Sequence, residues 1–181
     1  PVQHISLHGD KPVEALGLEQ EQNAFLGYRA IRICLDRPEL FLTQLRALLR
    51  ASAFGKVQIM FPMIATLEEL RRAKKYVAQA KEQLAQKGQA FDPNAPVGMM
   101  VEVPAAAVLA RQFAREADFF SIGSNDLTQY TMAADRMNPK VEHLSNPMGP
   151  AVLTLIAQTI QAAKQAGIPC SVCGELAGMV Y

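Results

Sequence analysis

The sequence predicts an α/β fold with a parallel sheet, on three observations. Four short apolar runs recur along the chain, at residues 57–61, 97–103, 118–123 and 170–173. They are hydrophobic almost throughout, without polar alternation, as expected for strands buried on both faces. Stretches with helical spacing of apolar residues separate them, and strands that alternate with helices are typical of parallel α/β folds.

Capping signals predict the first helices. Asp36 with Glu39, and Thr66 with Glu69, fit the capping box, in which side chains at a helix start bind free backbone N–H groups. The helix after Thr66 carries one apolar stripe and is predicted to stop near Gly88. Charged residues outside the stripe are interpreted as a solvated face.

Proline and glycine mark the later helices. A third helix is predicted to begin at Pro104, and a fourth to run from about Pro150 to Gly167, because proline favours the first helical turn and glycine the end. This succession fits either a doubly wound sheet or a (β/α)8 barrel. Since a whole barrel takes about 250 residues, a barrel here would be partial.

Composition excludes several classes of protein. The 181 residues carry 18 basic and 17 acidic side chains, so the formal charge of +1 disfavours a nucleic-acid binder. No apolar run approaches the roughly 20 residues of a membrane span, and the first residues lack a signal-peptide pattern. Three cysteines do not suggest a disulfide framework. We therefore expect a cytoplasmic protein with reduced thiols and no membrane partner.

Acidic residues end two successive predicted strands. Glu102 interrupts an apolar run just before Pro104, and the next run delivers Asn125 and Asp126 into the loop that follows it. Taken singly, Glu102 fits a solvated strand end, and the Asn-Asp pair fits a turn or helix cap. Together, the carboxylates of Glu102 and Asp126 are hard oxygen ligands that suit Mg²⁺, with water and a substrate completing the shell.

Arginines extend this hypothesis towards a phosphorylated acid. Arg136 follows Asp126 by ten residues, and Arg29 and Arg32 precede the first clear strand. The guanidinium fork matches carboxylate and phosphate groups. One of Arg29 and Arg32 is expected to be only a helix-surface cation.

Cys170 and Cys173 form a C-x-x-C pair on a predicted strand. Residues three apart on a strand point to opposite faces, which disfavours a shared zinc ion. Cys173, at the strand end, is either a small core residue or a proton donor facing the acidic pair. No histidine follows a strand, and neither G-x-x-x-x-G-K-[ST] nor G-x-G-x-x-G after a strand occurs. Phosphate binding would therefore depend on arginine, metal and backbone N–H groups.

Five segments carry a family resemblance: FLGYRAIRICLDRPELF, LRALLRASAFGKVQIMFPMI, GMMVEVPAAA, DFFSIGSNDLTQYTMAADR and CGELAG. They resemble the C-terminal phosphoenolpyruvate-binding domain of enzyme I, the phosphoenolpyruvate-protein phosphotransferase of the bacterial sugar phosphotransferase system. Pyruvate phosphate dikinase and phosphoenolpyruvate synthase share the architecture, but GYRAIR and LTQYTMAADR are closer to enzyme I. The resemblance covers residues 23–178 and implies a partial barrel with its first and last strands missing. We therefore expect one partial barrel domain over 1–181 with a divergent opening segment, 1–22.

The resemblance implies a role for each candidate residue. It implies Mg²⁺ ligation by Glu102 and Asp126, proton donation by Cys173, and substrate contacts from Asn125, Asp126, Arg136 and Arg29. The implied reaction transfers the phosphoryl group of phosphoenolpyruvate to a histidine on a separate domain and yields pyruvate. Implied partners are that phosphohistidine domain, its phosphocarrier protein and a second copy of the chain in a homodimer.

The opening segment departs from the family pattern. Where the family has R-T-x-D-x-G-G-D-K, Gln3 replaces a phosphate-binding arginine, Ser6 an aspartate and His8 a glycine. A neutral amide cannot supply the guanidinium charge, so weaker binding of phosphoenolpyruvate is expected.

Two further functions stay open. A non-catalytic interaction fragment would associate through exposed strand edges and apolar helix faces. A lyase on a related barrel would use Mg²⁺ and the Glu/Asp pair to stabilise an enolate during carbon–carbon cleavage.

Overall fold

The computed structural model describes residues 2–4 and 23–178. The chain folds into two compact units, the first formed by residues 1–62 and 68–95 and the second by 63–67 and 96–181. A single domain over 1–181 stays a prediction. Among the described residues, no helix combines the length and apolar character needed to cross a bilayer.

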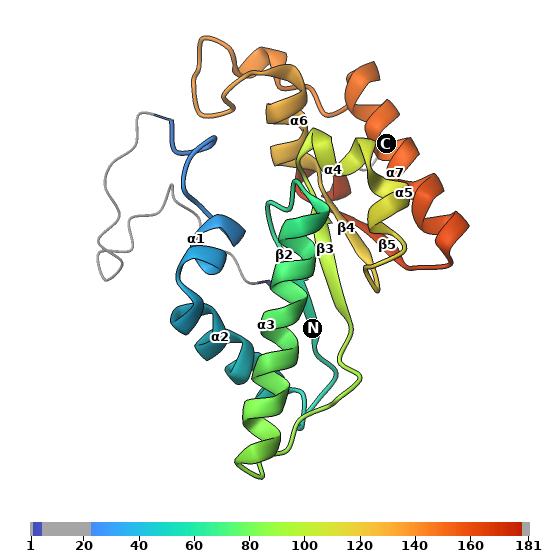
Figure 1. Ribbon diagram of the computed structural model, residues 1–181. Helices are drawn as coiled ribbons and strands as arrows, with labels where there is room; N and C mark the ends of the chain where they lie inside the picture. The colour runs from blue at the N-terminus through green and yellow to red at the C-terminus, as the bar shows by residue number, and fades with distance from the viewer. Residues whose placement is uncertain (1, 5–22, 179–181) are drawn as a thin grey trace. The chain divides into compact units, whose positions relative to one another are not determined.

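Two parallel strands and three helices make up the first unit (Figure 1). The elements, in chain order, are β1 (Val2–His4), α1 (Ile31–Asp36), α2 (Pro38–Ala51), β2 (Gln58–Phe61) and most of α3 (Leu67–Gln86). In the register of the two strands, Gln3 lies opposite Ile59. Gln3 therefore lies on β1, whereas the two other departures from the family pattern, Ser6 and His8, lie outside the described residues.

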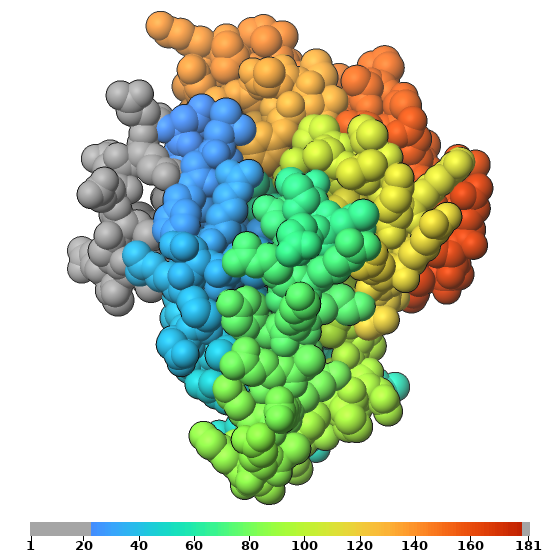
Figure 2. All heavy atoms as spheres, in the orientation of Figure 1, coloured from blue at the N-terminus to red at the C-terminus, as the bar shows by residue number. Residues whose placement is uncertain are grey.

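Aromatic rings hold the first unit together. Phe41 of α2 packs edge-on against Phe61 of β2, with ring centroids 5.9 Å apart, and against Tyr76 of α3, at 5.6 Å. The stripe of α3 faces this core, with Leu70, Ala73, Val77, Ala80 and Leu84 buried. The outer side of α3, green in Figure 2, is open to solvent. The predicted amphipathic helix is confirmed.

One predicted cap is wrong. Asp36 does not begin a helix but ends α1, and its Oδ2 accepts a hydrogen bond from the Tyr28 hydroxyl at 2.6 Å. The next helix begins at Pro38 after Arg37, which makes no side-chain cap. Proline at the first helical position determines this boundary, because its fixed φ suits a helix start and its missing N–H needs no partner. The second predicted start is confirmed in position, since α3 begins directly after Thr66.

Three strands and several helices make up the second unit (Figure 1). The elements are β3 (Val97–Val101), α4 (Pro104–Val108), α5 (Ala110–Phe113), β4 (Phe120–Gly123), α6 (Ser124–Met132), the 3-10 turn η2 (Glu142–Leu144), α7 (Pro150–Ala166), β5 (Cys170–Cys173) and the 3-10 turn η3 (Glu175–Gly178). Strand β4 pairs in parallel with β3 on one side and with β5 on the other. The parallel α/β fold is confirmed, but the expected burial on both faces is wrong for β5, whose residues are half-buried or exposed.

Helices of the second unit start and stop where proline and glycine predict. Helix α4 begins at Pro104, and α7 runs from Pro150 to Ala166, with Gly167 in the left-handed conformation at φ 71° as its C-cap. Both α4 and α5 pack against α7. The third predicted helix is divided in two at Leu109, whose φ of −95° and ψ of 16° leave helical geometry.

Helix α1 contains a thiol suited to a test of burial. Cys34 is 1% exposed, and desolvation raises the pKa of its thiol from the ordinary 9.0 to about 12. The folded state therefore retains a proton that the unfolded state releases above pH 9. We expect the free energy of unfolding to be unaffected by this group below pH 9 and to fall by up to about 1.4 kcal/mol per pH unit between pH 9 and 12.

Urea titrations at several pH values, compared between the native chain and Cys34→Ser, would measure this difference. Other groups that titrate above pH 9 remain in both proteins, so they cancel in the comparison. Equal pH slopes for the two proteins would contradict the buried thiol.

Candidate active site

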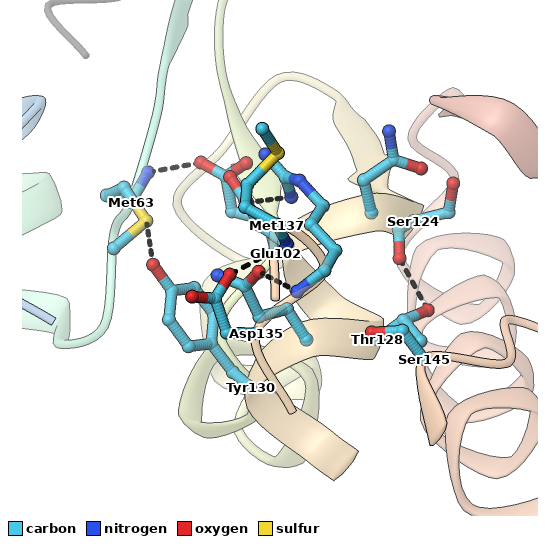
Figure 3. Close-up of polar contacts among 12 residues, drawn as sticks. Met63, Glu102, Ser124, Thr128, Tyr130, Asp135, Met137 and Ser145 are labelled. Atoms are coloured by element: carbon cyan, nitrogen blue, oxygen red, sulfur yellow. Dashed lines mark hydrogen bonds and ion pairs between the residues drawn. The ribbon is translucent and has the colours of Figure 1, made fainter. Parts of the chain in front are cut away.

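Strand β3 carries Glu102 into the interior of the second unit. All five residues of β3 are buried, and Glu102, next along the chain, is 4% exposed. Its Oε1 accepts a hydrogen bond from the backbone N–H of Met63 at 2.7 Å (Figure 3). A buried carboxylate needs such partners, because desolvation disfavours its charged form. Glu102 is therefore a buried, hydrogen-bonded carboxylate, which excludes the alternative that it merely ends a strand in solvent.

A glycine on the neighbouring strand makes room for Glu102. A Cβ atom placed on Gly123, the last residue of β4, would lie 2.8 Å from Glu102 Cβ and 2.9 Å from Glu102 Oε2. Any side chain at position 123 would occupy the same space. The carboxylate of Glu102 therefore lies directly over the end of β4.

Helix α6 follows β4 without a loop, which corrects one prediction. Asn125 and Asp126 lie in the first turn of α6, which begins at Ser124, and not in a loop. Asp126 is buried there, and a carboxylate is favoured near a helix N-terminus by the helix dipole. The direct step from strand to helix holds Asp126 more firmly than a loop would.

Arg136 reaches Asp126 from beyond the end of α6. Its Nη1 donates to Asp126 Oδ1 at 2.5 Å, and its backbone N–H donates to Gln129 Oε1 at 3.0 Å. The Arg136 side chain is 31% exposed and that of Asp126 only 9%. The guanidinium therefore pairs with a buried carboxylate, while the Arg136 side chain remains partly exposed.

Strand β5 brings Cys173 to the same junction. Cys173 lies opposite Gly123 in the parallel register, and its thiol donates to the backbone carbonyl of Ile122 at 3.4 Å and accepts from Ser121 Oγ at 3.7 Å. The carbonyl of Cys173 accepts a hydrogen bond from Ser124 Oγ at 2.8 Å. The thiol of Cys173 therefore lies against the end of β4, the strand that leads into α6.

Gly174 closes the junction after β5. Its φ is 93°, and a Cβ atom there would lie 2.9 Å from Asn125 Oδ1. That oxygen accepts a hydrogen bond from the backbone N–H of Glu175 at 3.1 Å. The amide of Asn125 is thus oriented by the turn that follows Cys173.

Five of the predicted residues therefore gather where three parallel strands end: Glu102, Asn125, Asp126, Arg136 and Cys173. Functional groups of parallel α/β folds lie at this edge, the C-terminal ends of the strands. Direct coordination of one ion by Glu102 and Asp126 stays a prediction.

The two arginines of the first unit differ in role. Arg32 lies in α1 and donates to the backbone carbonyls of Leu26 and Gly27 at 2.9 and 2.8 Å, so its guanidinium stabilises local structure. Arg29 is 1% exposed, with its guanidinium carbon 5.5 Å from the centre of the Phe25 ring. Ala30, which follows it, has φ 53° and ψ −126°, a conformation normally reserved for glycine. Contact of Arg29 with a substrate stays a prediction.

The donor set of the second unit fits Mg²⁺. Two buried carboxylates, Glu102 and Asp126, are hard oxygen donors close to a helix N-terminus. Mg²⁺ is commonly held by one or two carboxylates plus water and substrate oxygens, and it needs no dedicated cage. In residues 2–4 and 23–178, no group of three or more His, Cys, Asp or Glu side chains is placed to hold a metal. The candidate is therefore a two-carboxylate site completed by a ligand.

Sequence reasoning missed three residues that shape this site. The backbone N–H of Met63 binds the Glu102 carboxylate, and the Tyr130 hydroxyl in turn approaches Met63 Sδ at 3.8 Å (Figure 3). Gly123 supplies the space described above. Met63 follows the end of β2, so the rule that selected Glu102 also points to it, but an apolar side chain did not suggest a polar role for its backbone.

Known proteins share both the fold and the sequence. A citrate lyase structure from Burkholderia xenovorans LB400 superposes with a TM-score of 0.58 at 17% identity, over 76% of this chain and 41% of that one. At that identity the likeness shows the fold alone.

Sequence relatives are much closer. Phosphoenolpyruvate-protein phosphotransferases of Bacillus subtilis (strain 168) and Geobacillus stearothermophilus are 55% and 56% identical over 177 residues, 98% of this chain. The chain spans 31% of the length of each. The family model of the PEP-utilising enzyme, PEP-binding domain, matches residues 2–180. The resemblance in the motifs is thereby confirmed, and the chain belongs to the family of PEP-binding domains of PEP-utilising enzymes.

Proposed function

We propose that this chain is the substrate-binding part of a phosphoenolpyruvate-protein phosphotransferase. The observation that carries the proposal is the gathering of Glu102, Asn125, Asp126, Arg136 and Cys173 at one strand edge in a chain of the PEP-binding family. Parallel strands followed by helices, and the likeness to a citrate lyase structure, support a partial (β/α)8 barrel as the scaffold.

Charge and geometry suggest how the substrate is held. Glu102 and Asp126 would hold Mg²⁺, which when bound supplies positive charge opposite the phosphoryl and enolate oxygens. Arg136, whose side chain is partly exposed, would contact the phosphoryl group, and the family resemblance implies Arg29 as a second guanidinium. Asn125, oriented by the Glu175 N–H, would donate its amide to a substrate oxygen.

The proposed reaction separates phosphoryl transfer from protonation. The P–O bond of phosphoenolpyruvate breaks as an N–P bond forms to a histidine on another domain, and the electron pair stays on the enolate oxygen. The Cys173 thiol then gives its proton to the methylene carbon, which yields pyruvate and a thiolate that solvent reprotonates. Positioned cations stabilise the enolate charge before that proton arrives.

Other partners follow from the same proposal. The phosphorylated histidine would pass its group to a phosphocarrier protein, and the chain would pair with a second copy in a homodimer. Both stay predictions.

Titration calorimetry with oxalate, a mimic of the pyruvate enolate, tests ligand binding. We expect binding in Mg²⁺ and no binding in EDTA. In Glu102→Gln and Asp126→Asn, affinity should fall at least tenfold, about 1.4 kcal/mol, because each amide removes a charged donor. Glutamine keeps an oxygen that accepts the Met63 N–H, so the Glu102 variant should still fold.

Glu142→Gln is the matched control, because Glu142 is exposed on η2 of the same unit. Thermal unfolding of each variant would separate loss of binding from loss of fold. Binding of oxalate that persists in EDTA, or in both carboxylate variants, would refute the site.

A further inference from the structure

Met63 has an unusual backbone conformation beside the candidate site. Its φ is 57°, and only two other non-glycine residues in the described part of the chain, Ala30 and Ala133, have a positive φ. Met63 is 2% exposed and belongs to segment 63–67 of the second unit. A long side chain persists in left-handed geometry only where its surroundings enforce it, and such residues concentrate at functional sites.

Two contacts enforce this conformation. The Met63 N–H donates to Glu102 Oε1 at 2.7 Å, a short distance for an N–H donor and typical of a bond to a charged acceptor. From the other side, the Tyr130 hydroxyl of α6 approaches Met63 Sδ at 3.8 Å (Figure 3). Met63 therefore links the helix that carries Asp126 to the carboxylate of Glu102.

The two oxygens of Glu102 are oriented by different neighbours. Oε1 accepts the Met63 N–H, and Oε2 lies over Gly123, where even a Cβ atom would approach it to 2.9 Å. The terminal torsion of a glutamate is soft, so without such contacts its carboxylate plane would vary. The Met63 N–H is thus one of the contacts that orient the carboxylate of Glu102.

We propose that Met63 is a positioning residue for Glu102: its left-handed backbone aims an N–H group that fixes the carboxylate in the orientation needed to bind Mg²⁺. The inference rests on the proposed function and deepens it. The essential property is the backbone conformation, and the side chain serves to hold it against Tyr130.

Substitutions at position 63 separate backbone conformation from side-chain volume. Glycine adopts positive φ freely and retains the N–H, so Met63→Gly should hold the half-saturating Mg²⁺ concentration for oxalate binding within about twofold. Valine keeps apolar bulk but resists positive φ, so Met63→Val should raise that concentration about tenfold.

Met99→Val is the matched control, because it trims a fully buried methionine of β3 in the same unit. Met99→Val should destabilise the fold, while the half-saturating Mg²⁺ concentration for oxalate binding stays within twofold of the native value. Met63→Val with native Mg²⁺ dependence, or Met63→Gly as impaired as Met63→Val, would overturn the inference. If the native chain itself shows no Mg²⁺-dependent binding of oxalate, the proposed function fails instead.

A spectroscopic measurement applies even if Met63→Val does not fold. The amide proton of Met63 should resonate downfield in the native chain, and Glu102→Gln should move it upfield, because a charge-assisted bond becomes a neutral one. An amide resonance that Glu102→Gln leaves in place would contradict the contact on which the inference depends.

Discussion

In Cys173→Ala, exchange of the methyl protons of pyruvate with solvent deuterium is expected to fall about 10²–10⁴-fold, the usual contribution of a positioned acid or base. Protonation of the enolate and removal of a methyl proton are the same step in opposite directions. Cys173 lies level with Gly123 at the end of β5, next to the strand that leads into Asp126. Proton NMR of pyruvate in D₂O with the chain and Mg²⁺ would follow the exchange.

Oxalate separates the role of the thiol from substrate binding. Oxalate has no methylene carbon, so Cys173→Ala should bind it with native affinity in Mg²⁺. Cys170→Ala is the control, because Cys170 begins the same strand three residues earlier, at the level of Phe120. Equal exchange rates in the two variants would assign the proton transfer to another group.

Proline and glycine residues at helix ends made much of the fold predictable. Helix α7 matches its predicted bounds because Pro150 and Gly167 act through their own backbone chemistry, independently of the rest of the chain. Strand β5 occupies the predicted residues 170–173. Asp36 shows the limit of such local rules, since its carboxylate accepts from Tyr28 instead of capping the next helix. A four-residue capping motif does not show whether its acidic residue begins one helix or ends another.

The candidate site was predictable where it depends on strand ends. Glu102 follows the buried strand β3 and Cys173 ends the partly exposed strand β5, so their meeting at one sheet edge follows from parallel topology. The contact of Asp126 with Arg136 could not be predicted from hydrophobic periodicity or from position at a strand end, because it depends on how the chain turns after α6. The direction of the Met63 N–H depends on a rare positive φ, which a methionine in the sequence does not predict.

Gly123→Ala is expected to have the second large effect, a loss of Mg²⁺-dependent oxalate affinity of about 10- to 100-fold, or roughly 1.4–2.7 kcal/mol. The reason is space and not backbone freedom, since φ at Gly123 is an ordinary −84°. The added methyl would lie 2.9 Å from Glu102 Oε2 and 2.9 Å from Met100 Sδ. Thioether and carboxylate must both move, and such overpacking costs about 1–3 kcal/mol of stability.

Comparison with Gly55→Ala distinguishes the two contributions. Nothing lies within 4 Å of a Cβ atom at Gly55, so that variant adds the same methyl without a collision. If Gly123→Ala lowers Tm without weakening Mg²⁺-dependent oxalate binding, then the Glu102 carboxylate can leave the end of β4 at no cost to the ligand. That result would remove Glu102 from the metal site, because a ligand to the ion cannot be displaced without loss of affinity. Weakened binding at nearly native Tm would instead show that the geometry of this one carboxylate, held between Gly123 and the Met63 N–H, determines the affinity.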